Sequence, residues 1–140
     1  MEDCIFCKLA NGVIPTRTLY EDEMVRVILD AAPATKGHAL ILLKDHREDF
    51  YALSDEQATH VMKVAKVLAL HLKNVLACDG LNVLQNNGEA AGQTIFHYHM
   101  HLVPRYNEKP PAIDLHSGQA SDAQLQEIYE QLTTQEMEMV

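Results

Sequence analysis

The spacing of apolar residues along the chain predicts two long helices. Between positions 54 and 79, apolar residues recur every three or four positions, at Ala58, Val61, Ala65, Leu68, Leu72 and Val75. This spacing is typical of a helix that buries one face. Ser54 and Gln57 form a capping-box pattern at its start. Ser121 and Gln124 repeat the pattern before a second apolar stripe, so we expect an acidic C-terminal helix at about 121–138.

Shorter segments predict β-strands because they alternate in polarity or are rich in β-branched and aromatic residues. They are residues 19–20, 24–29, 39–43, 81–85 and 98–103. The acidic run 21–23 between the first two is typical of a hairpin turn. Strands joined by short turns, with one long helix inserted and one at the end, predict an α+β fold with an antiparallel sheet and two main helices. A length of 140 residues favours a single domain, 1–140.

Composition narrows the class of protein. Eleven Lys and Arg against 20 Asp and Glu give a net charge of −9, which argues against a general nucleic-acid binder. No apolar run approaches the roughly 18 residues of a membrane span, and the acidic start lacks the layout of a signal peptide. Three cysteines in a chain of this kind do not form a disulfide framework. We therefore expect a cytoplasmic protein that binds neither nucleic acid nor membranes.

Histidine is the residue type that indicates chemistry. In a strand, side chains alternate between faces, so His97, His99 and His101 would share one face. Tyr98, Met100 and Leu102 would anchor the other face on the core. Imidazoles two residues apart are spaced by roughly 6.6 Å, which suits several contacts to one multi-oxygen anion, or a metal bound by two of the three.

A loop that could hold an anion precedes this histidine row. Residues 86–94 combine amides, a hydroxyl and glycines that let backbone N–H groups approach a phosphate. Imidazole is largely neutral near pH 7, so its free nitrogen can attack phosphorus without a separate base. His99 is the candidate nucleophile because neighbours reach it from both sides.

Cys4 and Cys7 have the spacing of two thiolate ligands on one metal. A redox pair is the alternative, but it is typical of a βαβ setting that this chain lacks. The thiols could also be reduced and unliganded. His46 is a better third ligand than Cys78, which follows a helix with no ligand-like neighbour.

The segment His97–Val103 resembles the His-φ-His-φ-His-φ-φ motif of the histidine triad (HIT) superfamily, in its Hint-like branch. The likeness extends to Cys4–Pro15, to Lys44–His46 and to Pro104–Arg105. The resemblance implies an antiparallel sheet with two helices, a homodimer, and hydrolysis or transfer at the α-phosphate of nucleoside phosphoramidates or dinucleoside polyphosphates. It implies His99 as the nucleophile that forms a nucleotidyl intermediate, supported by His101 and His38.

The resemblance also implies a nucleotide site and a metal site. Asp30 would bind the ribose hydroxyls, and the base would lie against Ile5, Phe6, Leu9, Ile14 and Leu29. The phosphate or leaving group would contact Asn86, Gly92, Gln93 and Thr94. In relatives that carry the two cysteines, a structural zinc would be held by Cys4, Cys7, His46 and His97. Asn86 stands where the Fhit-like branch has glutamine, which puts a preference for dinucleoside polyphosphates in doubt.

Two other functions fit the same residues. The pocket could belong to a purine-nucleotide sensor or partner-binding module that catalyses nothing, because a phosphate cradle binds whether or not chemistry follows. A metal hydrolase using His97, His99 and His101 as ligands is the third hypothesis. Three successive positions on one face of a straight strand splay too far for that, which favours the nucleotidyl-histidine enzyme.

Overall fold

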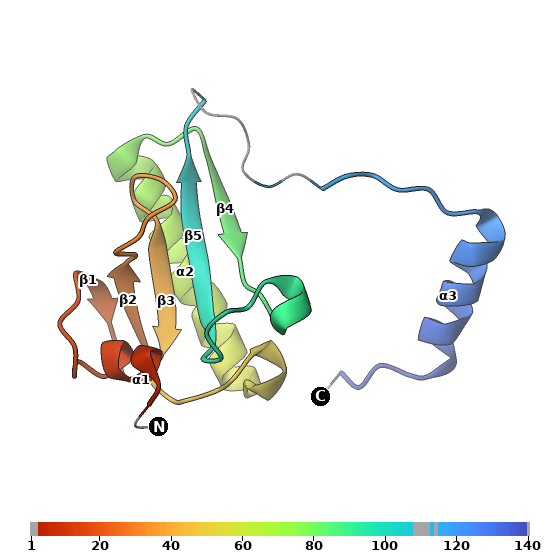
Figure 1. Cartoon of the computed structure of the whole chain (residues 1–140), viewed down its shortest axis with the longest axis horizontal. Coiled ribbons are helices and arrows are strands. Elements are labelled where there is room, and N and C mark those ends of the chain that lie inside the picture. The colour runs from red at the N-terminus through yellow and green to blue at the C-terminus, as the bar shows by residue number, and fades with distance from the viewer. Residues whose placement is uncertain (1–2, 108–112, 114, 140) are drawn as a thin grey trace. The chain divides into compact units, whose positions relative to one another are not determined.

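The sheet at the centre of the protein has five antiparallel strands in the order β1-β2-β3-β5-β4 (Figure 1). In this computed structural model, residues 3–107, 113 and 115–139 are described. The strands are β1 Thr18–Glu21, β2 Val25–Leu29, β3 Ala39–Leu43, β4 Gly80–Leu84 and β5 His99–Arg105. The predicted α+β class and antiparallel sheet are confirmed.

The long helix α2, Asp55–Leu76, covers one face of the sheet (Figure 1). Both bonds of the predicted capping box are present between Ser54 and Gln57. The helix ends at Ala77, whose left-handed backbone turns the chain into β4. Its buried stripe packs on the sheet and forms the main core with residues from β2, β3 and β5, among them Val27, Ile41, Val61, Leu68, Leu72, Met100 and Leu102.

The opposite face of the sheet carries a smaller apolar cluster. Leu40 and Leu42 of β3 point to this side and pack with Phe6 and Ala10, which belong to the short helix α1, Ile5–Ala10. Sequence analysis missed α1 because six residues are too few to show a helical period. The Cys4 thiol caps its first turn by accepting a hydrogen bond from the Cys7 amide at 3.3 Å.

The histidine row differs from the prediction at its first member. Strand β5 begins at His99, and His97 lies in the bend before it. The Tyr98 amide donates to the Arg47 carbonyl at 2.6 Å and has no partner in the sheet. The predicted alternation of faces still holds, because Tyr98 packs in the main core with Met100 and Leu102, while His97, like His99, lies edge-on to the Phe6 ring of α1.

The chain divides into two compact units, Met1–Pro110 and Pro111–Val140. The second contains helix α3, Asp122–Thr134, which starts with the expected capping box between Ser121 and Gln124. Two single-turn 3₁₀ helices, Phe50–Ala52 and Glu89–Ala91, complete the elements. Among the described residues, none of the helices combines the length and hydropathy needed to cross a membrane.

Candidate active site

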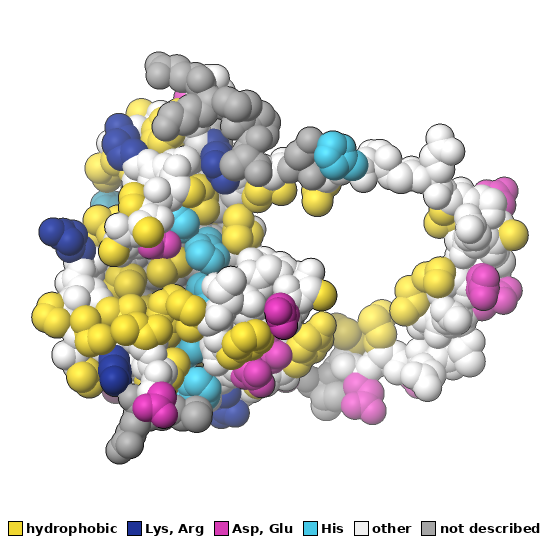
Figure 2. All heavy atoms as spheres, viewed as in Figure 1, with side chains coloured by type: hydrophobic (Ala, Val, Ile, Leu, Met, Phe, Trp, Pro, Cys, Tyr) yellow, Lys and Arg dark blue, Asp and Glu magenta, His cyan; other side chains and the backbone are white. Residues whose placement is uncertain are grey.

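His99 and His101 lie on the face of the sheet that carries α1. In the antiparallel register, His101 is opposite Leu40 and His99 is opposite Leu42. Paired residues share a face, so both imidazoles point to the smaller apolar cluster. The Phe6 ring meets the His99 ring edge-on, with 4.7 Å between centroids. Figure 2 shows histidine side chains on this face beside a patch of hydrophobic ones.

The backbone determines which nitrogen of His99 carries the proton. His99 Nδ1 lies 2.7 Å from the His97 carbonyl oxygen, which can only accept, so Nδ1 donates. In the neutral ring the lone pair is then on Nε2. Burial lowers the pKa of His99, which keeps the ring neutral at physiological pH. His99 thus presents an unprotonated nitrogen without help from a base.

His38 and His101 form a chain of hydrogen bonds whose direction is also fixed. The Ala34 amide donates to His38 Nδ1 at 3.0 Å, so the proton of neutral His38 is on Nε2. That nitrogen donates to His101 Nδ1 at 2.9 Å. The proton of His101 is therefore on Nε2. Burial lowers the pKa of His101 to about 4, and the neighbouring His99 and His38 add to the effect.

Asp30, His38 and His101 also bring three potential metal-ligand atoms within 4.8 Å of one another. Asp30 Oδ2 is 3.6 Å from His38 Nε2. A histidine that ligates a metal through one nitrogen donates the proton of the other, but His38 Nδ1 accepts from an amide. Its Nε2 is protonated and cannot ligate. This group is suited to passing a proton, not to holding a cation.

Next to His99 and His101 is a cavity of about 570 Å³, within the range of small-molecule sites. Nine residues predicted for catalysis or nucleotide binding line it: Phe6, Leu9, Leu29, Asp30, Asn86, Gly92, Thr94, His99 and His101. The lining combines apolar residues of the sheet, the Asp30 carboxylate and residues of the 86–94 loop. The structure therefore brings an apolar slot, a carboxylate and an amide-rich loop together beside an unprotonated imidazole.

Four predicted residues lie outside the cavity lining. His38 stands behind His101. Ile5 is exposed on α1, and Ile14 is half-buried in the turn that follows it. Gln93 is buried and braces the loop, because its amide donates to the carbonyls of Glu48 and Ile95 and accepts from the Gly88 amide.

The cavity has further lining residues that sequence analysis did not identify: Pro15, Thr16, Arg17, Ile28, Ala31, Pro33, Leu40 and Ile95. Arg17 is notable because it brings a positive charge to a lining that also contains Asp30. The Leu29 amide donates to the Arg17 carbonyl at 3.0 Å. Extending the predicted strand 19–20 by two residues toward the N-terminus would have placed Arg17 beside Leu29.

A second group of side chains lies at the N-terminus of α1 and consists of Cys4, Cys7, His46 and His97. His97 Nδ1 is 3.4 Å from each cysteine sulfur and 3.2 Å from His46 Nδ1. Cys7 Sγ is 3.3 Å from His46 Nδ1. Two ligands bound to one tetrahedral zinc at about 2.0–2.3 Å lie about 3.3–3.8 Å apart. The donor atoms are therefore already near the spacing that zinc requires.

The proton positions in this group also suit a metal. His97 is fully buried, and its Nε2 is 2.7 Å from the Leu43 carbonyl oxygen, so Nε2 donates and Nδ1 keeps its lone pair. Burial lowers the pKa of His97 to about 4 and raises the pKa of the Cys7 thiol. Burial therefore favours the neutral thiol, whereas a metal would bind the thiolate. Two sulfurs and two imidazoles form a donor set typical of a closed structural zinc site, which fits this group.

Sequence comparison relates the chain to named proteins. Residues 11–108 match the family model of the HIT domain. The Bacillus subtilis protein called Protein hit is 46% identical over 107 residues, which is 76% of this chain and 74% of that one. The Schizosaccharomyces pombe adenosine 5'-monophosphoramidase hnt1 is 39% identical over 106 residues, covering 76% and 77% of the two chains.

Solved structures show the same fold. A Streptococcus mutans protein superposes with a TM-score of 0.90 at 37% identity, over 96% of this chain and 85% of that one. A zinc-bound histidine triad family protein from Mycobacterium smegmatis superposes with a TM-score of 0.72 at 33% identity, over 95% and 97%. With most of the chain matched in both sequence and fold, this protein belongs to the HIT family.

Proposed function

We propose that the protein hydrolyses nucleoside 5'-phosphoramidates, or transfers their nucleotidyl group, with His99 as the nucleophile. The observation that carries the proposal is the hydrogen bond from His99 Nδ1 to the His97 carbonyl, because it leaves the Nε2 lone pair beside a nucleotide-sized cavity. Two relatives named adenosine 5'-monophosphoramidase, from Schizosaccharomyces pombe and Saccharomyces cerevisiae, support this substrate class. Dinucleoside polyphosphates are the second class that the same chemistry would accept.

The reaction follows from the two histidines of β5. In the first step, His99 Nε2 bonds to the α-phosphorus while the bond from phosphorus to the leaving nitrogen breaks. The leaving nitrogen takes up a proton through the Nε2–H of His101, which solvent replaces. In the second step, water bonds to phosphorus, the bond from phosphorus to Nε2 breaks, and one proton returns to solvent. His38 positions His101 and keeps the proton of that ring on Nε2.

The cavity would hold the nucleotide in a single direction. Phe6, Leu9 and Leu29 supply the apolar slot for a purine base, and Asp30 would accept hydrogen bonds from the ribose hydroxyls. Asn86, Gly92 and Thr94, which also line the cavity, would contact the phosphate or the leaving group. Gln93 would act indirectly by bracing the 86–94 loop. Ile5 and Ile14, which lie outside the lining, would contribute through packing only.

We also propose that Cys4, Cys7, His46 and His97 hold a structural zinc ion, which the donor spacing and the zinc-bound relative support. When bound, zinc would supply a fixed link between the N-terminus and the start of β5. The ligand His97 also provides the carbonyl that accepts from His99, so holding this residue holds the tautomer of the nucleophile. A homodimer in the cytoplasm completes the proposal: the dimer follows from the family resemblance, and a reducing compartment fits Cys4, Cys7 and Cys78, which form no disulfide.

Trapping the intermediate tests the proposal. The purified protein would be mixed with an adenosine phosphoramidate, quenched in base to preserve a phosphorus–nitrogen bond, and digested. We expect the mass of one adenylyl group on His99 in the peptide that contains residues 97–101. Nucleotide binding with no turnover and no adduct would instead support a nucleotide sensor.

A further inference from the structure

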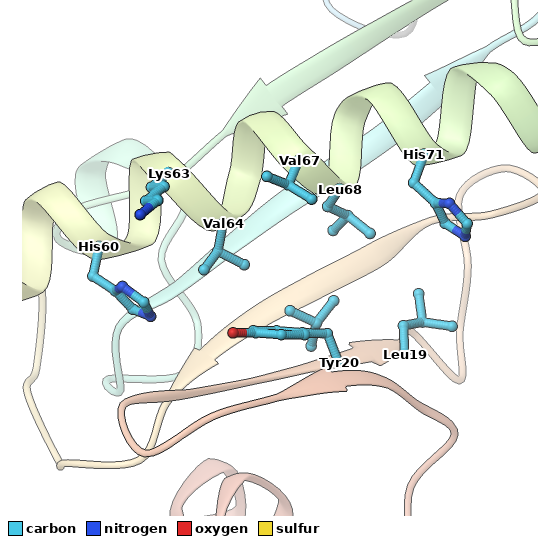
Figure 3. Close-up of a pocket in the computed structure, with 9 residues that line it drawn as sticks. Leu19, Tyr20, His60, Lys63, Val64, Val67, Leu68 and His71 are labelled. Carbon is cyan, nitrogen blue, oxygen red and sulfur yellow. The ribbon is translucent and has the colours of Figure 1, made fainter.

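A second cavity, of about 390 Å³, lies between α2 and the β1–β2 hairpin and shares no lining residue with the candidate active site (Figure 3). Its walls are mainly apolar: Val64, Val67 and Leu68 from α2 lie opposite Leu19 and Tyr20 from β1. Val64 and Leu68 are buried, whereas Val67 is 65% exposed and Leu19 is 45% exposed. Apolar surface therefore continues from the core to the rim of an open groove, which is suited to receive an apolar ligand.

The groove is elongated. It follows α2, with His60 at one end and His71 at the other (Figure 3), and at about 1.5 Å per residue these two positions are about 16 Å apart along the helix. Its volume is near the lower end of the range of small-molecule sites, about 300–1,000 Å³. A small volume spread over this length is suited to an unbranched chain, whereas a compact ring system would need a wider site.

Basic side chains stand beside these apolar walls. Lys63 lines the groove together with the two histidines, and no acidic residue is among the described lining residues. Helix α2 also has no acidic residue after Glu56. Within the part of the chain that the structure describes, Lys63 forms no ion pair. An ammonium group without a carboxylate partner, beside apolar walls, complements a ligand that combines an apolar chain with a negative charge.

The hairpin side of the groove is held in place by hydrogen bonds. Asp22 accepts from the Tyr20 hydroxyl at 2.8 Å and from His60 Nε2 at 2.6 Å, and its other carboxylate oxygen accepts from two backbone amides of the hairpin turn. The bond to His60 ties the hairpin to α2, so the groove is preformed, which lowers the cost of ligand binding. Since His60 is already paired, Lys63 is the cation that an anionic ligand would meet.

We propose that this groove binds a free medium-chain monocarboxylate, with its alkyl chain between Val67 and Tyr20 and its carboxylate beside Lys63. Binding would remove apolar surface of both partners from water. A neutral chain would leave the charge of Lys63 unmatched. A phosphate would bring a second negative charge, although Lys63 is the one lysine or arginine among the described lining residues. The inference does not depend on the proposed catalytic activity.

Isothermal titration of the full-length protein with hexanoate, octanoate and decanoate, each below its micellar concentration, tests the proposal. We expect saturable binding of one carboxylate per chain. Each added methylene should lower Kd by at least about twofold, since complete burial of one methylene corresponds to about fourfold. Absence of saturable decanoate binding, as would follow if a protein segment filled the groove, would overturn the proposal. Affinity that does not rise with chain length would overturn it too.

Three variants of α2 locate the binding site. Val67→Glu places a negative charge in the groove and should raise the Kd for decanoate by at least about tenfold. Lys63→Gln removes the proposed partner of the carboxylate and should raise it by about fivefold, the upper range for an exposed ion pair. Lys66→Gln, the matched control, removes a charge from an exposed residue outside the lining and should change Kd by less than about twofold. All three positions are exposed and both new residues are good helix formers, so the variants should fold. If Lys66→Gln weakens binding as much as Lys63→Gln, the proposal is wrong.

Two competing ligands complete the test. The candidate active site is also apolar in part, so the titration with decanoate is repeated in saturating AMP, which should change Kd by less than about twofold. Competitive displacement by AMP would place the carboxylate in the nucleotide cavity and contradict the proposal. The neutral analogue 1-decanol tests the role of charge: Lys63→Gln should leave its Kd unchanged. Equal weakening of decanol and decanoate in this variant would show that Lys63 does not pair with the carboxylate.

Discussion

Two groups of close-packed titratable side chains flank the start of β5, and they have opposite chemistry. The metal-type group contains Cys4, Cys7, His46 and His97, and the proposed catalytic group contains Asp30, His38 and His101. In both, ligand-type atoms lie within 4.8 Å of one another. The distances and the residue types alone would identify either group as a metal site.

The difference comes from the main chain. The Leu43 carbonyl accepts a hydrogen bond from His97 Nε2, which leaves the lone pair on Nδ1 facing the cysteines. An amide, that of Ala34, donates to His38 Nδ1 and forces a proton toward His101. One backbone contact to the far nitrogen therefore decides whether an imidazole holds a cation or passes a proton. The predictions below test that distinction, from the largest expected effect to the smallest.

Replacing the nucleophile should have the largest effect. His99→Asn removes the Nε2 lone pair that attacks phosphorus, and we expect kcat for a nucleoside phosphoramidate to fall by about 10⁴-fold or more. The Kd for AMP, measured by calorimetry, should change by less than about threefold because the cavity keeps its shape. Turnover near the wild-type rate in this variant would exclude His99 as the nucleophile.

Breaking the metal-type group should cost stability before activity. Cys7→Ser removes one soft ligand, and we expect metal content to fall from about one zinc per chain to near zero and the free energy of unfolding to fall by about 3 kcal/mol. Elemental analysis of untagged protein and thermal unfolding measure the two effects. Cys78→Ser is the matched control, since Cys78 lies outside the group. Unchanged zinc content in Cys7→Ser would place the metal elsewhere.

A change in the proposed catalytic group should have the opposite pattern: it should weaken substrate binding and leave the zinc content unchanged. Asp30→Asn leaves the cysteines untouched, so zinc content should stay at the wild-type value while KM rises by about tenfold, a loss of about 1.4 kcal/mol in binding the ribose. Steady-state kinetics and elemental analysis of the same sample provide both readings. Loss of zinc in Asp30→Asn would show that this group, too, binds the ion.

How far the sequence could predict these sites depends on the kind of interaction. Strict alternation predicted that Tyr98, Met100 and Leu102 anchor the strand on the core while His97, His99 and His101 share the other face, because strand geometry is local. The same rule did not show that β5 begins only at His99, since the Tyr98 amide bonds to Arg47, a partner 51 positions away in sequence. The ligand set of the metal-type group followed from family resemblance, because spacing indicated only the two cysteines and His46.

The positions of the protons on the histidine rings could not be predicted from the sequence for a related reason. Backbone carbonyls and amides occur along any chain, so the sequence does not mark those of Leu43 and Ala34 as special. Only the folded positions of β3 and of the turn before His38 place them beside an imidazole. Gln93 is a similar case: its residue type suits a phosphate ligand, but burial directs its amide to the loop backbone. Side-chain chemistry is visible in sequence, whereas the partner that directs it is set by tertiary structure.

The smallest expected effect is the acid sensitivity that His101 confers. Burial holds its pKa at about 4 in the folded protein, against about 6.5 in the unfolded chain. Between these two values the unfolded chain binds a proton that the folded protein does not, so stability is fully present above pH 6.5 and falls as the pH drops toward 4. Because the ring borders an open cavity, we expect a loss of about 1 kcal/mol from this residue.

Denaturant unfolding between pH 7 and 5, with His101→Gln as the comparison, measures this loss of stability. The variant should lose less stability over that range than the wild type, and equal slopes would show that folding does not lower the pKa of His101.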